Sequence, residues 1–443
     1  MTSGGWVNCL RASSALGFLV IATAQANAGG FALREQSPYG QGTSFAGVAA
    51  GGALSSTFWN PATMTQLPGV VSETDVTGIF PYASHTPLPG STLTALGFGA
   101  NGDSASDAAV PAGYFSYQLN PNLWFGLAMN APFGLSVNFN DNFAGRDYAG
   151  ATTLRTYNTT PMIAYRFNDW ISVGAGVQIQ YGTANLSTGV GATRGLDLLI
   201  GGGGWAYGFT AGVTLTPTPT TTIGIGYRSA LDQKINGTLS TTIGPVGATS
   251  YGSVNTTLNL PDSVSLGIRQ VLDPRWTVMG TVEWTNWSRI GTSNILQPSG
   301  APATIGGTAI RLPFQYDDGW FFSAGAEYIW SNQLTLRSGI GYEISPISDQ
   351  VRTPRLPDND RFWLSVGASW KVFRGVHFDV AYSHLWVKDP SINISATSGN
   401  PWFNGAVAYV GDVSAHVDIL SVALVWRPDE LGALPSKTLL VTK

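Results

Sequence analysis

The stretch "FWLSVGASWKVFRGVHFDVAYSHLW", residues 362–386, decides the fold. Side chains alternate through 362–372, and the alternation resumes through 376–386 after the short connection "FRG". A period of two indicates a β-strand whose two faces meet different surroundings. Two such strands joined by three residues form an antiparallel hairpin. In the first strand one face is apolar and the other is small or polar: Phe362, Leu364, Val366, Ala368, Trp370 and Val372 against Trp363, Ser365, Gly367, Ser369 and Lys371.

The same pattern recurs along most of the chain. Short connections such as "ND" (168–169) and "SN" (331–332) alternate with long ones near 84–107, 136–151, 190–202 and 239–252. Short turns on one side and long loops on the other are typical of an antiparallel outer-membrane barrel with an even number of strands. Closure pairs every strand edge, which lipid requires. We predict an all-β fold, a 14-stranded antiparallel transmembrane β-barrel over residues 70–427, whose strands begin near positions 70, 108, 122, 152, 170, 200, 220, 253, 275, 310, 333, 358, 376 and 413.

The composition favours a membrane barrel. Charged residues make up 11% of the chain, against about 25% in soluble domains. The net charge of −4 gives no basic surface for nucleic acid. The alternative is a secreted protein of two packed sheets, which should have shorter strands and a dry core. Aromatic residues near the segment ends are expected at the membrane interfaces: Trp124, Trp170, Trp276, Trp330 and Trp386.

The N-terminus predicts export to the bacterial outer membrane. Residues 15–24, "ALGFLVIATA", form an apolar run behind Arg11, and Ala26-Asn27-Ala28 fits a signal-peptidase site. A membrane helix is the alternative, but the run is too short to span a bilayer. We expect a signal peptide at 1–28. The single cysteine, Cys9, lies within it, so we expect neither disulfides nor cysteine metal sites in the mature chain, and no metal cluster stands out.

The segment "SSTFWNPATMTQLPG", residues 55–69, differs from the strands that follow it. Asn60 favours turns, and Pro61 fixes φ and lacks an N–H. We therefore expect compact irregular structure before the first strand. Residues 29–69 need somewhere to sit, and the barrel lumen is the predicted place. The alternative is that the segment only positions the first strand.

Pro132 interrupts an otherwise regular strand, "LWFGLAMNAPFGL" at 123–135. Proline cannot donate a hydrogen bond to a β-ladder, so it marks an edge, a bulge or a strand end. Two interpretations stay open. Either the strand kinks and opens the wall, or it ends at the following loop.

Charged residues expected to point into the lumen form a second candidate site. An arginine there could hold a ligand carboxylate through a bidentate contact, or the charges could form a salt-bridge network that braces the plug. Their mixed signs favour bracing, and Arg228 is the strongest candidate for either role. The predicted set is Arg146, Arg166, Arg228, Arg269, Glu283, Glu327 and Arg337, with Glu343, Lys371 and Asp379 beside it.

The stretch "LDLLIGGGGW", residues 196–205, falls in a predicted long loop. Exposed apolar loops often mark a capture site. The candidate capture residues are Leu196, Leu198, Leu199 and Ile200, and the alternative is that they form the upper part of the next strand.

Several motifs occur in an order that carries a family resemblance. They include "GGFALREQSPYGQGTSFAG" (29–47), "NPA" (60–62), "MNAPFGL" (129–135) and "LPDNDRFWLSVGASW" (356–370). With them the chain resembles the FadL/TodX-type outer-membrane transporters of long-chain fatty acids and other hydrophobic compounds. Two features depart from that pattern: the loop between strands five and six is shorter than in the fatty-acid transporters of the family, and a C-terminal tail follows at 428–443.

The resemblance implies a barrel plugged by an N-terminal hatch, residues 29–69. It implies a lateral opening in the third strand and a hydrophobic small-molecule substrate. We expect no cofactor and no enzymatic activity. The implied hatch residues are Gly29, Phe31, Asn60, Pro61 and Ala62. The implied opening residues are Asn130, Pro132, Phe133 and Gly134.

We therefore expect transport of long-chain fatty acids or aromatic hydrocarbons by capture in an apolar pocket, where each buried methylene contributes about 0.8 kcal/mol. The expected surroundings are outer-membrane lipid and lipopolysaccharide around a single barrel. One alternative is a general aqueous porin. Another is a lipase, but no G-x-S-x-G motif occurs and nothing places a serine beside a histidine.

Overall fold

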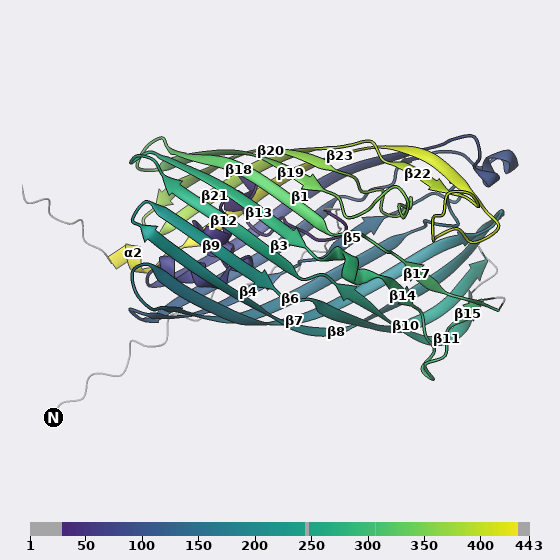
Figure 1. Cartoon of the computed structure of the whole chain (residues 1–443), viewed down its shortest axis with the longest axis horizontal. Coiled ribbons are helices and arrows are strands. Elements are labelled where there is room, and N and C mark those ends of the chain that lie inside the picture. Colours follow the sequence, from purple (N-terminus) through teal and green to yellow (C-terminus); the bar gives the residue numbers. More distant parts are fainter. Residues whose placement is uncertain (1–28, 244–247, 306, 433–443) are drawn as a thin grey trace, which may run out of the picture.

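The computed structural model describes residues 29–243, 248–305 and 307–432, and within these ranges the chain closes into a β-barrel (Figure 1). The predicted signal peptide and residues 433–443 lie outside them. Closure is made by the first and last strands, which pair from Ser72↔Trp426 to Pro87↔Gly411. The fourteen wall strands are β1 (Val70–Pro87), β3 (Ala108–Asn120), β4 with β5 (Leu123–Asn130, Gly134–Val137), β6 (Thr152–Arg166), β7 (Ile171–Val190), β8 (Thr193–Thr218), β9 with β10 (Thr221–Arg228, Leu231–Ile243), β11 with β12 (Ala248–Leu260, Ser263–Val271), β13 (Trp276–Thr285), β18 (Gly319–Ile329), β19 (Leu334–Ile344), β20 (Arg361–Phe373), β21 (Val376–Val387) and β23 (Tyr409–Trp426).

Short turns join the strands at one end of the barrel and long loops at the other, which confirms the predicted arrangement (Figure 1). Six further strands belong to the long loops or extend the wall at that end: β2 (Asn101–Asp103), β14 (Thr292–Asn294), β15 (Thr304–Ile305), β16 (Thr308–Ala309), β17 (Arg311–Pro313) and β22 (Ser391–Ile394). The tenth wall strand starts at Gly319, later than predicted, because residues 311–313 pair with β14 instead.

Two of the predicted long loops are wrong. Strands β7 and β8 continue their pairing up to Val190↔Thr193, so the predicted loop at 190–202 is a hairpin with a turn at Gly191, whose φ is +55°. In the same way β10 and β11 extend through most of the predicted loop at 239–252. The wall therefore rises above the membrane on this side.

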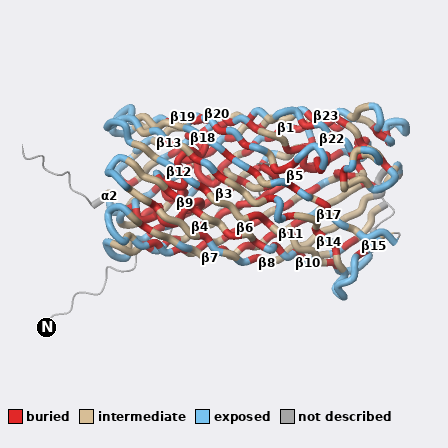
Figure 2. The backbone as a smooth tube through the Cα atoms, viewed as in Figure 1, coloured by how far each residue is buried: buried red, intermediate tan, exposed pale blue. Residues whose placement is uncertain are grey.

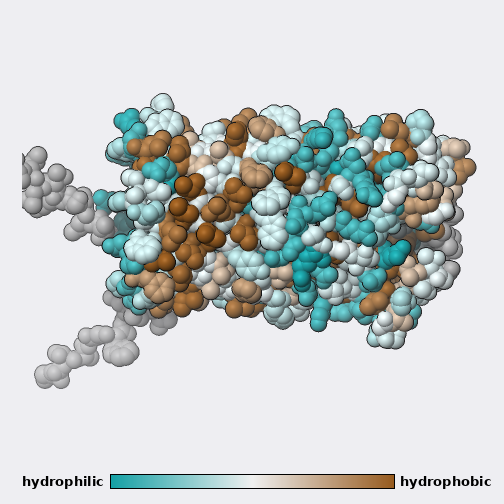
Figure 3. All heavy atoms as spheres, viewed as in Figure 1, coloured by the Kyte–Doolittle hydropathy of each residue, from teal (hydrophilic) through white to brown (hydrophobic). Residues whose placement is uncertain are grey.

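The two faces of the wall meet different surroundings, as the alternation predicts. On β20, Val366 is 51% exposed whereas Trp363 and Ser365 are fully buried. Figure 3 shows apolar side chains gathered towards the short-turn end and hydrophilic ones towards the loop end. An outward apolar band of this kind fits lipid contact.

Four of the five predicted interface tryptophans are exposed on the outer face: Trp170, Trp276, Trp330 and Trp386. Trp124 is a correction. Its side chain is fully buried in the lumen, where Nε1 donates to Leu67 O at 2.8 Å. The prediction used its position near a strand end and ignored its place in the alternation.

Residues 29–69 form a plug, which we call the hatch. It contains a short helix and three 3-10 turns: α1 (Pro38–Gln41), η1 (Val48–Ala50), η2 (Leu54–Phe58) and η3 (Pro61–Gln66). Nearly all its residues are buried inside the barrel, and Figure 2 shows buried backbone filling this part of the lumen. The plug predicted for this segment is therefore present.

Asn60 fastens the hatch to the wall. Its side chain accepts a hydrogen bond from Ala62 N and so caps η3. Its Nδ2 donates to Ala49 O at 2.7 Å and to Val213 O of β8 at 2.9 Å. This close approach needs glycine in the wall, because a Cβ on Gly212 would lie 2.0 Å from Asn60 Oδ1.

No helix among the described residues is long and apolar enough to cross a membrane. The described part of the tail forms α2 (Asp429–Gly432), where Asp429 Oδ2 accepts from Val70 N at 2.7 Å. This end of the chain therefore packs against the start of the first strand.

A charge placed on the outward face should destabilise the barrel according to its depth. We expect Val366→Lys, within the apolar band, to lower the free energy of unfolding from lipid vesicles by about 2–4 kcal/mol, and Phe373→Lys beside a short turn by about 0–1 kcal/mol. Guanidinium unfolding followed by tryptophan fluorescence measures both. Equal losses for the two variants would contradict the assigned lipid band.

Candidate functional site

The wall is interrupted in its third strand. β3 and β4 pair from Asn120↔Leu123 up to Gly113↔Met129, and contact resumes at the bridge Ala105↔Val137. Between these points the described ladder has no rung, so residues 107–112 face residues 130–135 unpaired. We call this interval the window.

Pro132 lies at the centre of the window and explains it. Against β6, pairing passes from Asn130↔Asn158 to Gly134↔Arg155, so three residues of the third strand oppose two of β6. This is a bulge, and a proline is tolerated there because it need not donate. All four residues of β5 are buried where an exposed wall strand would alternate, so the strand bends inward. The strand continues beyond Pro132, which rules out the interpretation that it ends there.

The start of the hatch occupies the strand edge that β3 leaves empty. Leu33 N donates to Pro132 O at 2.8 Å, and Gly134 N donates to Phe31 O at 2.9 Å. Together with the bridge Ala32↔Phe133 they form a short antiparallel ladder. Residues of the plug thus satisfy backbone groups that would otherwise be orphaned beside lipid.

Side chains of the hatch and of the wall form further hydrogen bonds that close the window beside this ladder. Gln36 Nε2 donates to Ala131 O at 3.0 Å. Tyr114 OH donates to Gln36 O at 2.6 Å and accepts from Asn130 Nδ2 at 2.7 Å. Asn130, predicted as part of the opening, therefore links the wall to the hatch.

A second irregularity of the wall differs from the window. The ladder that joins β8 to β9 and β10 skips residues 204–208 and 230–235. There Gln233 Nε2 donates to Gly204 O at 2.7 Å, so a wall side chain spans the gap. Of these two irregularities, the described hatch backbone fills only the window.

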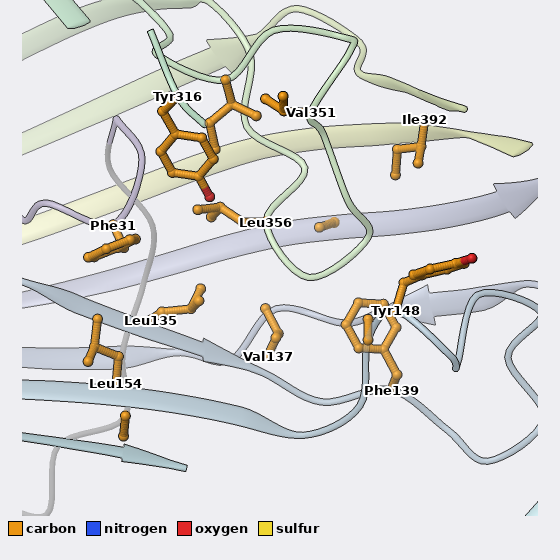
Figure 4. Packing of buried hydrophobic residues seen from close by; sticks show 14 of the residues in the cluster. Phe31, Leu135, Val137, Phe139, Tyr148, Leu154, Tyr316, Val351, Leu356 and Ile392 are labelled. Carbon is orange, nitrogen blue, oxygen red and sulfur yellow. The ribbon is translucent and has the colours of Figure 1, made fainter. Parts of the chain in front are cut away.

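An apolar cavity of about 60 Å³ lies on the loop side of the hatch. Phe31 lines it, and Figure 4 shows Phe31, Leu135, Leu154, Tyr316 and Leu356 around this space. Its remaining lining residues are Thr152, Ala184, Leu186, Ile200, Ile235, Thr256, Leu258, Ile295, Leu312, Phe314, Thr353, Arg355 and Trp402.

A second cavity, of about 80 Å³, reaches the window. Ala32 and Leu33 of the hatch line it, together with Pro132 and Phe133 of the wall. Since Phe31 lines the first cavity and its neighbours line the second, this part of the hatch separates the two. The Phe31 ring is held edge-on against Trp287, with centroids 4.7 Å apart.

Buried charges connect the hatch to the wall. Arg34 Nη1 lies 2.6 Å from Glu283 Oε1, and its Nη2 lies 3.5 Å from Glu343 Oε1. Tyr39 OH donates to Glu327 Oε2 at 2.8 Å, and Arg337 Nε lies 2.8 Å from the same oxygen.

The network extends along the wall. Arg337 Nη1 also approaches Asp379 Oδ1 at 3.7 Å, and Arg269 Nη2 approaches Glu327 Oε1 at 3.7 Å. Contacts of this kind are what the salt-bridge interpretation predicts, in which the charges brace the plug against the wall.

Three of the remaining predicted cations also contact the hatch or the loops. Arg228 Nη1 donates to Phe58 O at 3.0 Å, and its guanidinium lies 4.1 Å from the centre of the Phe58 ring. Arg166 donates to Thr65 O of the hatch. Arg146 lies in the loop after β5 and pairs with Asp197 at 3.1 Å. Lys371 is exposed near a short turn.

The predicted capture loop is a strand, which is a correction. Residues 196–200 belong to β8, and Leu198 and Ile200 pack against a buried cluster of Leu239, Val254, Ile295 and Ala303. Ile200 also lines the loop-side cavity. The glycine-rich sequence after these residues hides the alternation, so the strand is not evident from the sequence.

Sequence reasoning missed Arg34, Glu35, Arg355 and Asp358. Asp358 Oδ2 accepts from Gly30 N at 2.9 Å and so holds the start of the hatch. Burial, with a contribution from the Glu343 carboxylate, raises the pKa of Glu35 to about 7. The run "RTPRLPDNDR" at 352–361 was a usable signal, because charges are dense there in a chain with 11% charged residues.

Comparisons with known proteins agree with this architecture. The model of the family described as "Outer membrane protein transport protein (OMPP1/FadL/TodX)" matches residues 19–427. The chain belongs to this family. It is 26% identical to the long-chain fatty acid transport protein of Escherichia coli O157:H7, over 89% of this chain and 97% of that protein.

Solved structures confirm the fold. The crystal structure of a Pseudomonas aeruginosa FadL homologue superposes with a TM-score of 0.78 at 21% identity, covering 89% of this chain and 99% of that one. The Ralstonia pickettii toluene transporter TbuX gives a TM-score of 0.64 at 17% identity, covering 88% and 98%. As a member of an outer-membrane family, the chain is assigned to the bacterial outer membrane.

Removing Arg34 should leave two buried carboxylates without their partner. We expect Arg34→Met to lower the free energy that protects the hatch against opening by about 3–5 kcal/mol. Native-state proteolysis with thermolysin measures this energy. The triple variant Arg34→Met, Glu283→Gln, Glu343→Gln should recover a large part of the loss, and a single variant as protected as wild type would contradict the bracing role.

Proposed function

We propose that the chain carries hydrophobic small molecules, long-chain fatty acids or aromatic hydrocarbons, across the outer-membrane surface and releases them sideways into the membrane. The ligand enters the loop-side cavity, passes Phe31, and leaves through the window between β3 and the bent third strand. The observation that carries the proposal is the window itself, a wall break filled by hatch backbone. Named relatives that transport long-chain fatty acids or toluene support the substrate class.

The path suits an apolar solute. The loop-side cavity is lined mostly by apolar side chains, and each methylene buried there contributes about 0.8 kcal/mol. Two backbone hydrogen bonds hold residues 31–33 to residues 132 and 134. Only these two bonds to the third strand have to break for residues 31–33 to leave the window. The rest of the hatch stays fastened by Asn60 and the charge network.

The proposal includes no catalysis. One barrel suffices, because the window and both cavities lie within one chain. The exposed apolar band would contact membrane lipid, and the wall above it would stand among lipopolysaccharide. A general porin is disfavoured by the buried hatch and would show large steady ion conductance.

Locking the hatch into the window should stop release. Ala32 and Phe133 form a non-hydrogen-bonded pair, flanked by the Leu33–Pro132 and Phe31–Gly134 bonds. The Cα atoms of such pairs lie about 4.5 Å apart, within the range of a disulfide. In a Cys9→Ser background, Ala32→Cys with Phe133→Cys should therefore lose at least about tenfold of tritiated dodecanoate and toluene uptake when oxidised, and regain it on reduction.

The matched control is Ser44→Cys with Ser365→Cys. It joins the hatch body to β20 away from the window, where the two hydroxyl oxygens already lie 2.7 Å apart. This variant should transport in both redox states. Equal uptake by the oxidised and reduced window variant, with the disulfide verified by mass, would refute lateral release.

A further inference from the structure

We propose that the second irregularity of the wall, between β8 and β10, is a second lateral opening, and that it passes uncharged amphiphiles, long-chain alcohols with one hydroxyl group. We call this interval, residues 204–208 and 230–235, the seam. The inference rests on the proposed transport function, because it uses the same loop-side cavity. The route that it adds passes neither Phe31 nor the window.

The two strands meet along the seam without a ladder. Towards the short turns, Ser229 N donates to Phe209 O at 2.9 Å. Towards the loops, pairing resumes at Gly203↔Asn236. Residues 204–208 have no described rung on this side, which leaves roughly 17 Å of strand without a ladder.

Close contact and one side chain keep the seam closed. A Cβ built on Gly204 would lie 2.2 Å from Lys234 O, so glycine lets the two backbones touch. Gln233 is fully buried, and its Nε2 donates to Gly204 O at 2.7 Å. Gln180 Nε2 donates to Gln233 Oε1 at 3.1 Å. A side chain can move away by changing its rotamer, whereas elsewhere in the wall a backbone ladder would have to separate.

The seam borders both cavities. Ile235 lines the loop-side cavity, and Ser229 and Leu231 line the second cavity. Phe31 lies between the two cavities at the hatch, but the seam runs along the wall past both. A solute in the loop-side cavity therefore reaches the seam without displacing the hatch.

The outer mouth of the seam carries aromatic and charged side chains together. Trp205 and Tyr207 of β8 are exposed on the outer face. Asp232 and Lys234 of β10 are exposed beside them. Aromatic residues of this kind mark the level of the lipid headgroups. A molecule that leaves here can keep a polar group among the headgroups while its apolar body enters the lipid.

The lining of the seam favours an uncharged polar group. Its inward side chains, Leu231, Gln233 and Ile235, carry no charge, and Arg228 beside the seam already donates to the hatch. A carboxylate would therefore be buried without a counter-charge, which is costly. A hydrocarbon that displaced Gln233 would leave its amide and the Gly204 carbonyl without partners. A hydroxyl both donates and accepts, so it can replace each of these hydrogen bonds.

Locking the window separates the two routes. Cells that express the full-length chain with Cys9→Ser, Ala32→Cys and Phe133→Cys are given tritiated 1-dodecanol, dodecanoate or toluene, and cells without the chain supply the blank. 1-Dodecanol and dodecanoate share a chain length and differ in the headgroup. On oxidation, uptake of dodecanoate and toluene should be lost, whereas 1-dodecanol should keep most of its uptake through the seam.

Variants at Gln233, made in the oxidised window-locked chain, test the seam itself. Gln233→Ala removes the side chain that closes it and should raise 1-dodecanol uptake by about two- to tenfold, the equivalent of one neutral hydrogen bond. Gln233→Leu fills the seam with a side chain that cannot exchange hydrogen bonds with a hydroxyl, so it should lower that uptake by a comparable factor.

The matched control is Gln41→Ala. Gln41 is also fully buried and also donates to a wall carbonyl, Ile419 O of β23 at 3.1 Å, away from the seam. Its removal should leave 1-dodecanol uptake unchanged. Circular dichroism verifies that each barrel is folded.

The outcomes separate the inference from the function beneath it. Loss of 1-dodecanol uptake together with dodecanoate on oxidation would overturn the seam and leave release through the window standing. Retained 1-dodecanol uptake that neither Gln233 variant changes would also overturn the seam. Dodecanoate and toluene uptake that survives oxidation would overturn the window route, and the two Gln233 variants would still decide the seam.

Discussion

The structure depends on two backbone hydrogen bonds, from Leu33 to Pro132 and from Gly134 to Phe31. A barrel wall in lipid must satisfy every backbone polar group, because no water is present to do so. The bend at Pro132 breaks that rule between β3 and the third strand. The hatch supplies the missing hydrogen bonds from its own backbone. The wall is therefore complete only when the hatch is in place, and this constraint fixes the position of the plug.

This constraint divides the hatch into two parts. The body, from Tyr39 to Gln66, is fastened by buried charges, by Asn60 and by glycines that let two backbones meet. Residues 29–36 touch the window, and Phe31 separates the loop-side cavity from it. On the proposed route a solute would displace only residues 31–33, while Arg34 and the body of the hatch stay fastened to the wall. Pro132 creates the window in the wall, and the buried charges of the hatch hold the hatch in place beside it.

The sequence predicted the wall well because lipid outside and packed hatch inside impose opposite demands on alternate residues. The same alternation of faces would have placed Trp124 in the lumen. Its position near a strand end led to the wrong prediction. Leu198 and Ile200 were assigned to a loop because the glycines after them hide the alternation. Pro132 can be seen in the sequence as an interruption of a strand, but the bulge that it forms is evident only from the register against β6.

The cavity residues were harder to predict for a physical reason. Arg355 and Trp402 lie outside the main wall strands, in connections that have no periodicity. Only three-dimensional packing shows that Arg355 Nη1 and Trp402 Nε1 are buried without a hydrogen-bond partner among the described residues. Arg34 could be found in sequence as a charge within the hatch, but its two carboxylate partners lie about 250 and 310 residues away.

The central claim is that the window opens locally when a ligand passes. Hydrogen–deuterium exchange of the protein in nanodiscs, with and without octanoate, tests it most directly. The account predicts faster exchange in peptides covering residues 31–36 and 131–135, and unchanged protection of residues 54–66. Uniform exchange across the whole hatch, or unchanged protection at the window while ligand reaches the lipid, would contradict it.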